Sequence, residues 1–455
     1  MTYMKSKILT ILTACMLFLS CGEDRTHESD QYTEVQRWID GVMREVYYWY
    51  GDIPEPEKLN YFSQPPIFFN SLLSSKDGRS GVRFSTIIDK TEVTTRDVSA
   101  GMNYGIEYIL ESHPAARGYV ARILCVLPDS PAADKGLKRG DFILSINDQA
   151  VTNTNVTLLS GADVPLILSV GSWNDEQENI IERTTVELTN ISIVEDNPVY
   201  LSAIIQHANK HIGYLVYNHF TPGYSDSDTN YDRQLKEISN QFKSNIDELI
   251  IDFRYNGGGL LSSAQLICSL LVPEADLGKP LGHLEFNDKQ DPRTLSFNME
   301  KSMIEGGTNL SMNKIYFIVG RHTASASEMV INSLIPYMDV VLIGAQTIGK
   351  NVGSHVYTSE TYPWELHPID CKIYNALNTS DYERGFEPDY EINEFALNHI
   401  NTFLPLGDVN ETLLSTTLSI IDGSYQEEVP ETRSIVNEPV YSSLDRKYPP
   451  AVIIQ

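Results

Sequence analysis

The sequence feature that most restricts the possible folds is an alternation of strand-like and helix-like segments. It extends from residue 211 to residue 344. Apolar runs of strand length are predicted to be strands at Gly213–Asn218, Leu249–Phe253, Ile315–Val319 and Val340–Gly344. Helices are predicted between them at Arg233–Phe242, Ser262–Leu271 and Ser327–Tyr337. Apolar strands that alternate with helices are typical of a sheet covered by helices. We therefore expect an α/β core in this part of the chain.

The residues before this core predict a small helical unit. Apolar side chains recur at helical spacing at Val35, Trp38, Val42, Val46 and Trp49, and they indicate an amphipathic helix that ends before the prolines at 54 and 56. A second helical segment is predicted at residues 67–73. Because 455 residues exceed what one hydrophobic core usually organises, two or three domains are expected.

Residues 101–190 read mostly as strands and turns, and one string within them is distinctive. Pro131 suits the start of a short helix and Gly136 its end, and Gly140 and Asp141 turn the chain into a strand at Phe142–Ile146. This string resembles a PDZ domain of the circularly permuted bacterial kind. The resemblance implies a loop whose backbone N–H groups hold a peptide carboxylate while the peptide adds a strand. That loop is placed at Tyr104, Gly105, Ile106 and Glu107.

The N-terminus has the pattern of a secretory signal. Lys5 and Lys7 precede an apolar run at Ile8–Leu19, which is too short to span a bilayer comfortably. The small Ser20 before Cys21 resembles a bacterial lipobox, in which Cys21 would carry the lipid and begin the mature chain. An ordinary signal peptide with an incidental cysteine is the alternative. No second stretch of the sequence is long and apolar enough to predict a transmembrane helix.

Composition excludes several classes of function. A formal charge of −27 argues against nucleic acid as a partner and against attraction to anionic lipid. The ten histidines are scattered without HExxH spacing, and neither a metal nor a cofactor is predicted. Three cysteines lie far apart among apolar residues and are interpreted as buried thiols rather than as disulfides or a zinc site: Cys125, Cys268 and Cys371.

A glycine-rich string follows one of the predicted strands. It runs from Ile251 to Gly259 and reads IDFRYNGGG. Glycines at such a position let backbone N–H groups face an anion without a side chain in the way. A phosphate-binding loop is the competing interpretation. It is disfavoured because no Lys-Ser/Thr pair follows and the GxGxxG spacing is absent.

A serine and a lysine 25 positions apart are the candidate reactive groups. Ser325 lies at a predicted strand-to-helix turn, where a helix N-terminus can stabilise a developing oxyanion. Ser325 and Glu328 also form a capping-box pattern, so the serine could simply cap the helix. Lys350 lies between Ile348 and Val352, and burial there would lower the pKa of its amine enough to accept a proton from serine. A solvated surface lysine is the alternative.

The strings DFRYNGGG and TASASE, followed by a glycine–lysine pair at this interval, together resemble the C-terminal processing peptidase (tail-specific protease) family. The resemblance covers roughly residues 100–400, and the variant strings look like the lipoprotein branch of Bacteroidetes-type bacteria. It implies a multidomain α/β fold with a ClpP/crotonase-like protease core. A PDZ-like β-rich domain would be inserted in or precede this core, after the small helical N-terminal domain. The implied activity is that of a serine endopeptidase that cleaves unfolded or C-terminally exposed polypeptides outside the cytoplasm.

The resemblance also implies roles for individual residues. Ser325, rather than Ser327, would be the nucleophile and Lys350 the general base. The oxyanion hole would be formed by backbone N–H groups of Gly258 or Gly259 together with Ala326. Supporting positions are assigned to Asp252, Arg254, Glu328 and Thr347. Many members orient the lysine with a glutamine, and because Ser354 stands at that position here the third catalytic residue is left open.

The sequence allows three other functional interpretations. A Ser-His-Asp hydrolase using His322 lacks a GxSxG elbow, and a histidine three positions before the serine cannot easily face its hydroxyl. A crotonase-type acyl-CoA enzyme is disfavoured because a secreted, lipidated chain has little access to CoA. The strongest alternative is a surface-tethered scaffold without effective catalysis, which captures peptide C-termini through its PDZ-like domain.

These inferences predict the organisation of the whole chain. The expected partners are polypeptides bound through a free C-terminus and, through the lipid anchor, a membrane of the bacterial cell envelope. The substrate, the oligomeric state and the membrane face are left open. The predicted units are a signal peptide at 1–20, a lipidated tether at 21–33, a helical domain at 34–98, a PDZ-like domain at 99–192, a peptidase core at 193–425 and a tail at 426–455.

Overall fold

The structure is a computed structural model of the whole chain. It describes residues 26–79, 82–91, 100–113, 116, 118–161, 164–225, 227–427, 439–446 and 452–454. The predicted signal peptide and the lipidation site at Cys21 lie outside these residues. No helix within the described ranges has both the length and the apolar character needed to cross a membrane.

A six-stranded sheet forms the centre of the core, as the alternating sequence pattern predicts. In spatial order its strands are β10 (Val199–His207), β11 (Lys210–Tyr217), β12 (Glu248–Asp252), β15 (Lys314–Val319), β16 (Asp339–Gly344) and β21 (Tyr390–Glu391). β10 is antiparallel to β11, and the remaining pairs are parallel. Parallel neighbours require crossover connections, and helices lie in those from β11 to β12, from β12 to β15 and from β15 to β16.

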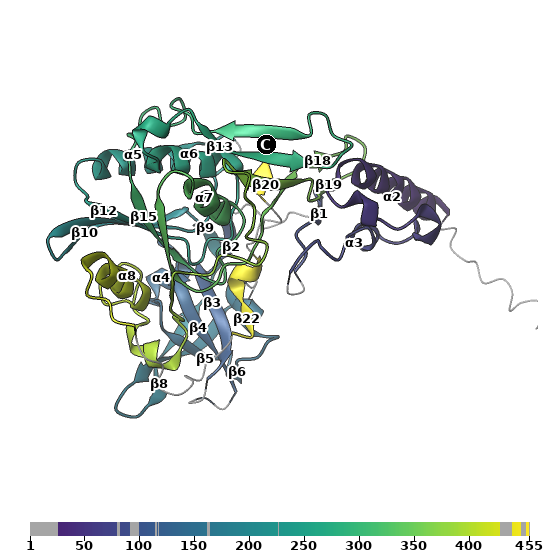
Figure 1. Cartoon of the computed structure of the whole chain (residues 1–455). Coiled ribbons are helices and arrows are strands. Elements are labelled where there is room, and N and C mark those ends of the chain that lie inside the picture. Colours follow the sequence, from purple (N-terminus) through teal and green to yellow (C-terminus); the bar gives the residue numbers. More distant parts are fainter. Residues whose placement is uncertain are drawn as a thin grey trace, which may run out of the picture.

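Helices cover both faces of this sheet (Figure 1). One face packs against α5 (Asn230–Phe242), α6 (Leu261–Leu271) and α7 (Ala326–Leu334), and the other against α8 (Thr412–Asp422). Alternate residues of one strand serve the two cores: Ile315 and Phe317 face the first, and Tyr316 and Ile318 face the second. The strands are therefore buried on both sides, which explains their continuous apolar sequence.

Two smaller sheets extend the core. The first has five strands in the order β14 (Thr294–Asn298), β13 (Pro280–Phe286), β20 (Cys371–Asn375), β17 (Val352–His355) and β23 (Val452–Ile454). The second consists of β1 (Thr86–Asp89), β19 (Trp364–His367) and β18 (Tyr357–Thr358). Two short 3-10 helices lie in connecting segments: η5 (Glu274–Asp276) and η6 (Leu397–Thr402). Cys125, Cys268 and Cys371 are buried free thiols, as predicted.

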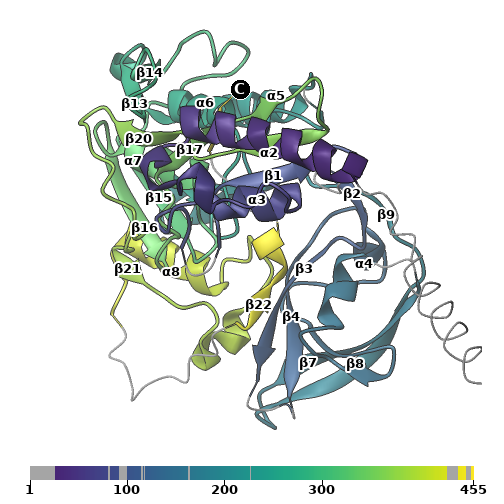
Figure 2. The same ribbon diagram turned by 90° about the vertical axis from the view of Figure 1, so that its right-hand side faces the viewer.

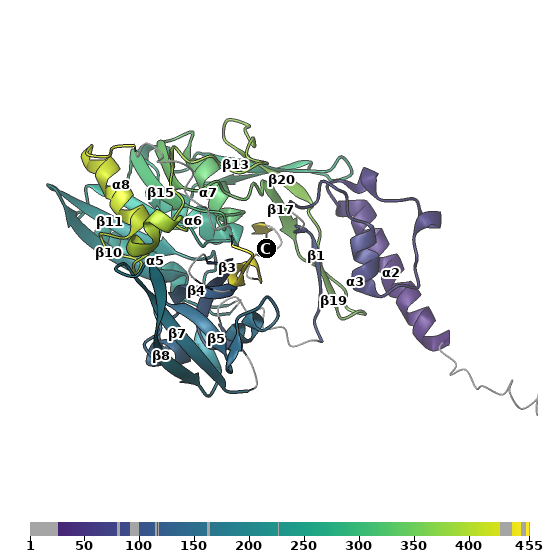
Figure 3. The ribbon, with the colours of Figure 1, turned by 90° about the horizontal axis from the view of Figure 1, so that it is seen from below.

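The N-terminal unit is helical and is attached to the core through β1 (Figure 3). It comprises α2 (Thr26–Val46), η2 (Tyr50–Asp52), η3 (Pro56–Lys58) and α3 (Pro65–Ser71). The apolar face of α2 includes Val35, Ile39 and Met43, and this cluster also includes Val352 and Leu366 of the core. The prediction of a tether up to residue 33 is wrong in part, because α2 begins at Thr26 before its periodic apolar positions.

The PDZ-like unit precedes the core in the chain and lies beside it (Figure 2). Its sheet contains β3 (Ile106–Ser112), β4 (Tyr119–Val126), β5 (Phe142–Ile146), β7 (Leu166–Asn174) and β8 (Asn179–Leu188), with β6 (Gln149–Ala150) paired to β5. The predicted short helix is α4 (Pro131–Asp134), capped by Ser130, and η4 (Val156–Ser160) follows. β2 (Ala100–Asn103) and β9 (Ser192–Glu195) pair at the boundary of the unit. β22 (Tyr441–Ser442) pairs with β3, and η7 (Ser443–Arg446) follows it.

Candidate active site

Ser325 lies at the turn between β15 and α7, where the sequence predicts it. Its backbone has φ of 60° and ψ of −115°, a strained conformation that for a residue other than glycine costs on the order of 1–3 kcal/mol. The side chain is fully buried and takes up the capping-box arrangement with Glu328, but its Oγ makes no hydrogen bond of normal geometry among the described residues. An unpaired buried hydroxyl on strained backbone is typical of a functional position rather than of a simple helix cap.

The turn that carries Ser325 is held against the end of β12. The hydroxyl of Thr323 donates to the carbonyl of Phe253 at 2.8 Å, and the N–H of Ala324 donates to the carbonyl of Asn256 at 3.1 Å. Ser327 donates its hydroxyl to the same Asn256 carbonyl at 3.1 Å. The two serines therefore differ in their contacts, because the hydroxyl of Ser327 holds the turn and that of Ser325 makes no hydrogen bond among the described residues.

Lys350 lies in the loop between β16 and β17, and only 4% of its surface is exposed. Burial lowers the pKa of its amine from the usual 10.5 to about 7, although the nearby carboxylates of Glu328 and Asp77 act in the opposite direction. Its Nζ is 5.3 Å from the centroid of the Phe84 ring. A buried lysine with this pKa is largely neutral slightly above pH 7, which is the state that a general base requires.

Glu328 connects the loops of Ser325 and Lys350. One carboxylate oxygen accepts hydrogen bonds from the backbone N–H of Ser325 at 3.0 Å and of Lys350 at 2.8 Å. The other accepts from the hydroxyl of Thr347 at 2.5 Å and from the N–H of Gly349 at 2.6 Å. Burial raises the pKa of Glu328, and these four donors oppose the increase. A single carboxylate thus fixes the position of one loop relative to the other.

The N-terminal unit supplies residues to this site that the sequence analysis missed. Arg79 donates from Nη1 to the carbonyl of Ile348 at 2.6 Å, two residues before Lys350. Asp77 is fully buried and accepts the N–H of Phe84 at 3.0 Å, which places the Phe84 ring beside the lysine. No local pattern distinguishes these residues, because they meet the lysine loop across more than half of the sequence.

The glycine-rich string also meets the serine turn. A Cβ added at Gly258, where φ is 110°, would lie 2.6 Å from Cβ of Ser325 and 2.9 Å from the backbone nitrogen of Ala326. The N–H of Gly258 donates to Oδ1 of Asn256 at 2.9 Å, so of the two predicted oxyanion donors Gly258 is the one whose N–H is already engaged. The chain at Gly259 has φ of 141° and packs on the backbone of Phe220.

Replacing Gly258 by alanine tests this close approach. We expect kcat to fall by about 10²–10³-fold, because the new methyl group must displace Ser325 and the nearby N–H groups that would serve an oxyanion. Gly278→Ala is the matched control, since Gly278 has φ of 91° but open space around its Cα. Steady-state proteolysis by both variants measures the difference. Equal activity of the two variants would contradict a close packing of Gly258 on Ser325.

Asp252 and Arg254 belong to a buried ionic cluster behind the glycine string. Arg254 bonds Asp252 at 2.8 Å, Glu411 at 2.7 Å and Glu394 at 3.0 Å. Arg139 of the PDZ-like unit bonds the same Glu394 at 2.7 Å. The coulombic attraction of Arg254, together with hydrogen bonds, lowers the pKa of Glu411 against the opposing effect of its burial. The two arginines therefore join the PDZ-like unit to the strand that precedes the glycines.

Ser354 lies on β17 and is fully buried. Its hydroxyl donates to the carbonyl of His355 at 2.9 Å. Glu328, Asp77 and Phe84 are groups that the structure places near Lys350.

The predicted carboxylate-binding loop of the PDZ-like unit is largely buried. Tyr104, Ile106 and Glu107 are each less than 7% exposed. Gly105 has φ of 77°, and its N–H donates to Oδ1 of Asn103 at 2.6 Å. This loop leads directly into β3, whose outer edge is paired with β22. The position for an added strand is therefore occupied by the C-terminal part of the same chain.

His322 lies in the turn before Ser325 and is buried. Burial and the positive charge of Arg321 lower the pKa of its imidazole to about 3. Its Nδ1 is 3.7 Å from a carboxylate oxygen of Asp445. The ring is therefore neutral at any pH near neutrality.

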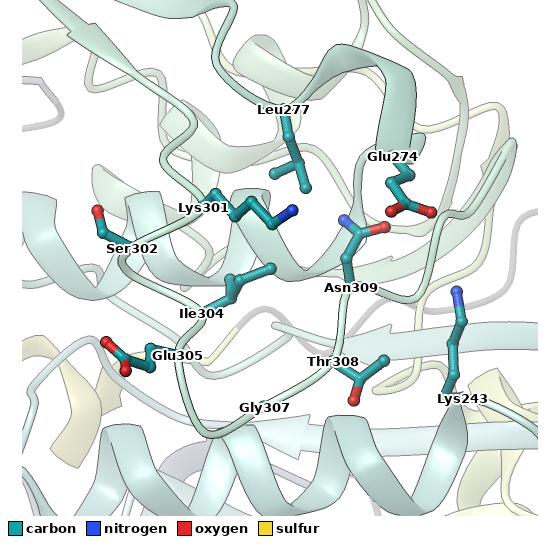
Figure 4. A pocket seen from close by; sticks show the side chains of 10 residues that line it. All are labelled: Lys243, Glu274, Leu277, Lys301, Ser302, Ile304, Glu305, Gly307, Thr308 and Asn309. Carbon is teal, nitrogen blue, oxygen red and sulfur yellow. The ribbon is translucent and has the colours of Figure 1, made fainter.

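A surface cavity of about 460 Å³ lies away from these residues (Figure 4). It is lined by the end of α5, by η5 and by the segment before β15, and its side chains include Lys243, Glu274, Lys301 and Glu305. None of the predicted site residues lines it. The residues that line this cavity carry both positive and negative charges, and they do not include a serine paired with a buried lysine.

Comparison with known proteins matches the three units of this fold. The family model described as peptidase family S41 matches residues 211–392, the S41 N-terminal domain matches residues 34–86, and a PDZ domain model matches residues 122–160. The chain is 23% identical over 392 residues to the carboxy-terminal-processing protease of Bartonella bacilliformis. The aligned region covers 84% of this chain and 80% of that protein. It is 25% identical over 239 residues to the chloroplastic C-terminal processing peptidase of Tetradesmus obliquus, across 50% of this chain and 48% of that protein.

A solved structure extends the likeness to most of the chain. A protein assigned to the S41 proteases of Bacteroides fragilis NCTC 9343 is 33% identical and superposes with a TM-score of 0.76, covering 86% of this chain and 98% of that one. The chain therefore belongs to peptidase family S41, with the N-terminal and PDZ domains of that family. It is accordingly a serine-type peptidase of the C-terminal processing group, and the predicted family and fold class are confirmed.

Proposed function

We propose that Ser325 and Lys350 form a catalytic dyad that hydrolyses peptide bonds. The observation that carries this proposal is the pair of hydrogen bonds by which Glu328 holds the backbone of both residues, with the lysine buried and its pKa lowered to about 7. The unpaired Oγ of Ser325 and its strained backbone support the same assignment.

In the proposed mechanism, neutral Lys350 accepts the proton of the Ser325 hydroxyl as Oγ attacks the scissile carbonyl carbon. The carbonyl oxygen becomes an oxyanion, and the backbone N–H groups of Gly259 and Ala326 stabilise it. The protonated lysine then gives its proton to the leaving amine as the C–N bond breaks. Water attacks the resulting ester with the same lysine as base, which releases the acid and restores Ser325.

The substrates in this proposal are unfolded polypeptides or polypeptides with an exposed C-terminus, bound through the PDZ domain. We also propose that Cys21 carries a lipid that anchors the mature chain to a membrane of the bacterial cell envelope. In this arrangement residues 21–25 connect the anchor to α2. The predicted boundaries at 34–98, 99–192 and 193–425 describe the three folded units in this proposal.

The pH dependence of cleavage tests the lysine directly. Because Lys350 acts in its neutral form and its pKa is about 7, the active fraction should fall about tenfold for each pH unit below that value. We therefore expect kcat/KM to rise through pH 7 and to level off about one unit above it. A histidine base at position 322 would titrate near pH 3 instead. A profile that stays flat from about pH 5 to 9 would exclude the lysine as base.

A further inference from the structure

The C-terminal segment of the chain runs along the ligand edge of the PDZ domain. Tyr441 pairs with Leu110 and Ser442 with Ile109 in antiparallel register, and β22 lies beside β3 in Figure 2. The N–H of Val440 donates to the carbonyl of Leu110 at 2.7 Å. The segment thus advances toward the start of β3 and the predicted carboxylate-binding loop. A peptide that adds a strand to a PDZ domain and ends at such a loop runs in this direction.

Side chains also fix the segment at the PDZ edge. The hydroxyl of Ser443 accepts the N–H of Tyr108 at 2.8 Å and donates to the carboxylate of Glu107 at 2.6 Å. Leu444 is 5% exposed and packs in a cluster shared by the PDZ domain and the core. The other members of the cluster are Ile109, Leu124, Tyr255, Phe395 and Phe403. The segment therefore occupies the junction of the two domains as well as the sheet edge.

From this junction the segment reaches both catalytic loops. Asp445 lies 3.7 Å from His322, three residues before Ser325. Further on, β23 pairs in parallel with β17, and Val452 stands opposite Gly353, three residues after Lys350. Ile454 is 7% exposed and joins the main core. The two described pieces, 439–446 and 452–454, therefore flank the dyad on its serine side and its lysine side.

The burial of Ser325 has a consequence for substrate access. Its side chain is fully buried, so a scissile peptide bond reaches Oγ only after neighbouring atoms move. The C-terminal segment is held by an edge strand at each end, and edge strands can be exchanged for another extended chain with the same backbone hydrogen bonds. A polypeptide that adds a strand at either edge would need the place that the segment fills.

We propose that the C-terminal segment is a built-in pseudosubstrate, which occupies the edges of β3 and β17 that an extended polypeptide substrate uses. The inference rests on the proposed function, and it adds that a segment of the same chain competes with the substrate for these edges. An incoming polypeptide must displace a segment of the same chain, whose effective concentration is on the order of millimolar. The enzyme is therefore restrained until a substrate C-terminus binds β3 well enough to replace β22.

A peptide with the sequence of residues 439–455 and a free carboxyl end is the probe. Its binding is measured by fluorescence anisotropy to Ser325→Ala chains that are either full length or end at residue 438. If the segment fills the edges in about nine of ten molecules, the full-length chain binds the peptide about tenfold more weakly than the shortened chain. Cleavage of an unfolded protein by the corresponding chains with Ser325 intact should rise by a similar factor on shortening.

Ser443→Glu provides the same test in the full-length chain, in case the loss of β23 impairs folding. The new carboxylate would face that of Glu107, so it should release the segment and raise both peptide binding and cleavage. Ser225→Glu is the matched control at an exposed loop position, and it should leave both unchanged.

The outcomes separate the two proposals. Equal peptide binding by the full-length chain, the shortened chain and the Ser443→Glu chain would overturn the pseudosubstrate. Tighter binding by the released chains would support it, even if none of the chains cleaves protein. In that last case the proposal of a catalytic dyad is wrong, and the proposal that the C-terminal segment occupies the two sheet edges is still supported.

Discussion

Lys350→Ala is expected to lower kcat/KM for an unfolded protein substrate by about 10³–10⁶-fold, and Ser325→Ala is expected to do the same. Without the lysine, the serine hydroxyl loses its proposed base, and the imidazole of His322, whose pKa is lowered to about 3, is a poor proton acceptor. Without the serine, the buried amine has no nucleophile to activate. The loss is measured as initial rates of cleavage with purified full-length chains.

Two control variants distinguish lost chemistry from lost structure. Ser327→Ala removes a hydroxyl that only bonds the Asn256 carbonyl, so cleavage should fall by less than about tenfold. Lys350→Met should melt at a higher temperature than the unmodified chain at pH 7. The lysine pKa is about 7 in the folded chain and about 10.5 in the unfolded one, so its burial destabilises the fold fully below pH 7. This cost disappears as the pH rises toward 10.5.

If both dyad variants keep the cleavage activity of the unmodified chain, the assignment of Ser325 and Lys350 is wrong. If the unmodified chain binds peptides with free carboxyl ends but cleaves nothing, the protein acts as a peptide-binding scaffold.

Arg254→Ala is expected to lower the free energy of unfolding by about 3–5 kcal/mol, because it leaves buried carboxylates without their main partner. Arg254 is 1% exposed and bonds Asp252, Glu394 and Glu411, and Arg139 alone would remain to balance three acidic groups. Chemical denaturation followed by fluorescence measures the change.

Arg233→Ala is the matched control for this variant. Arg233 is 65% exposed, and its ion pair with Glu237 lies at the surface, so its removal should change stability by less than about 1 kcal/mol. Similar losses in the two variants would mean that the buried cluster contributes no more than a surface pair.

The sequence predicted the core well because the relevant signals are local. A strand buried on both faces is a continuous apolar run, and an amphipathic helix repeats its apolar positions, so β12, β15 and α7 are found close to their expected bounds. The PDZ helix was also predicted from local chemistry, since Pro131 suits its start and Gly136 its end, and the structure adds Ser130 as its cap. The start of α2 was predicted too late because its first turns lack the apolar period.

The candidate site was predictable only in part. The sequence placed Ser325 and Glu328 in a capping box and left open whether the serine was a cap or a nucleophile. In the structure Glu328 bonds the backbone N–H of Ser325, while the Oγ of Ser325 has no partner among the described residues. A capping-box pattern in the sequence therefore does not distinguish a helix cap from a nucleophile. Asp77 and Phe84 reach Lys350 from another domain, and no local pattern records such contacts.

The C-terminal segment was likewise not predicted to form strands. β22 and β23 are two and three residues long, too short for an alternating pattern to emerge. Their partners, β3 and β17, lie far away in the sequence. Edge pairing of this kind depends on which sheet edges the folded domains leave open, and this is a property of the tertiary structure.

The dyad is tested most directly by reaction with a fluorophosphonate, which forms a covalent bond with an activated serine and requires no knowledge of the substrate. Peptide mapping by mass spectrometry should find the label on Ser325, with a labelling rate that rises through about pH 7 and is lost in Lys350→Ala. Labelling at another residue, or equal labelling of Lys350→Ala and the unmodified chain, would contradict the assignment of nucleophile and base.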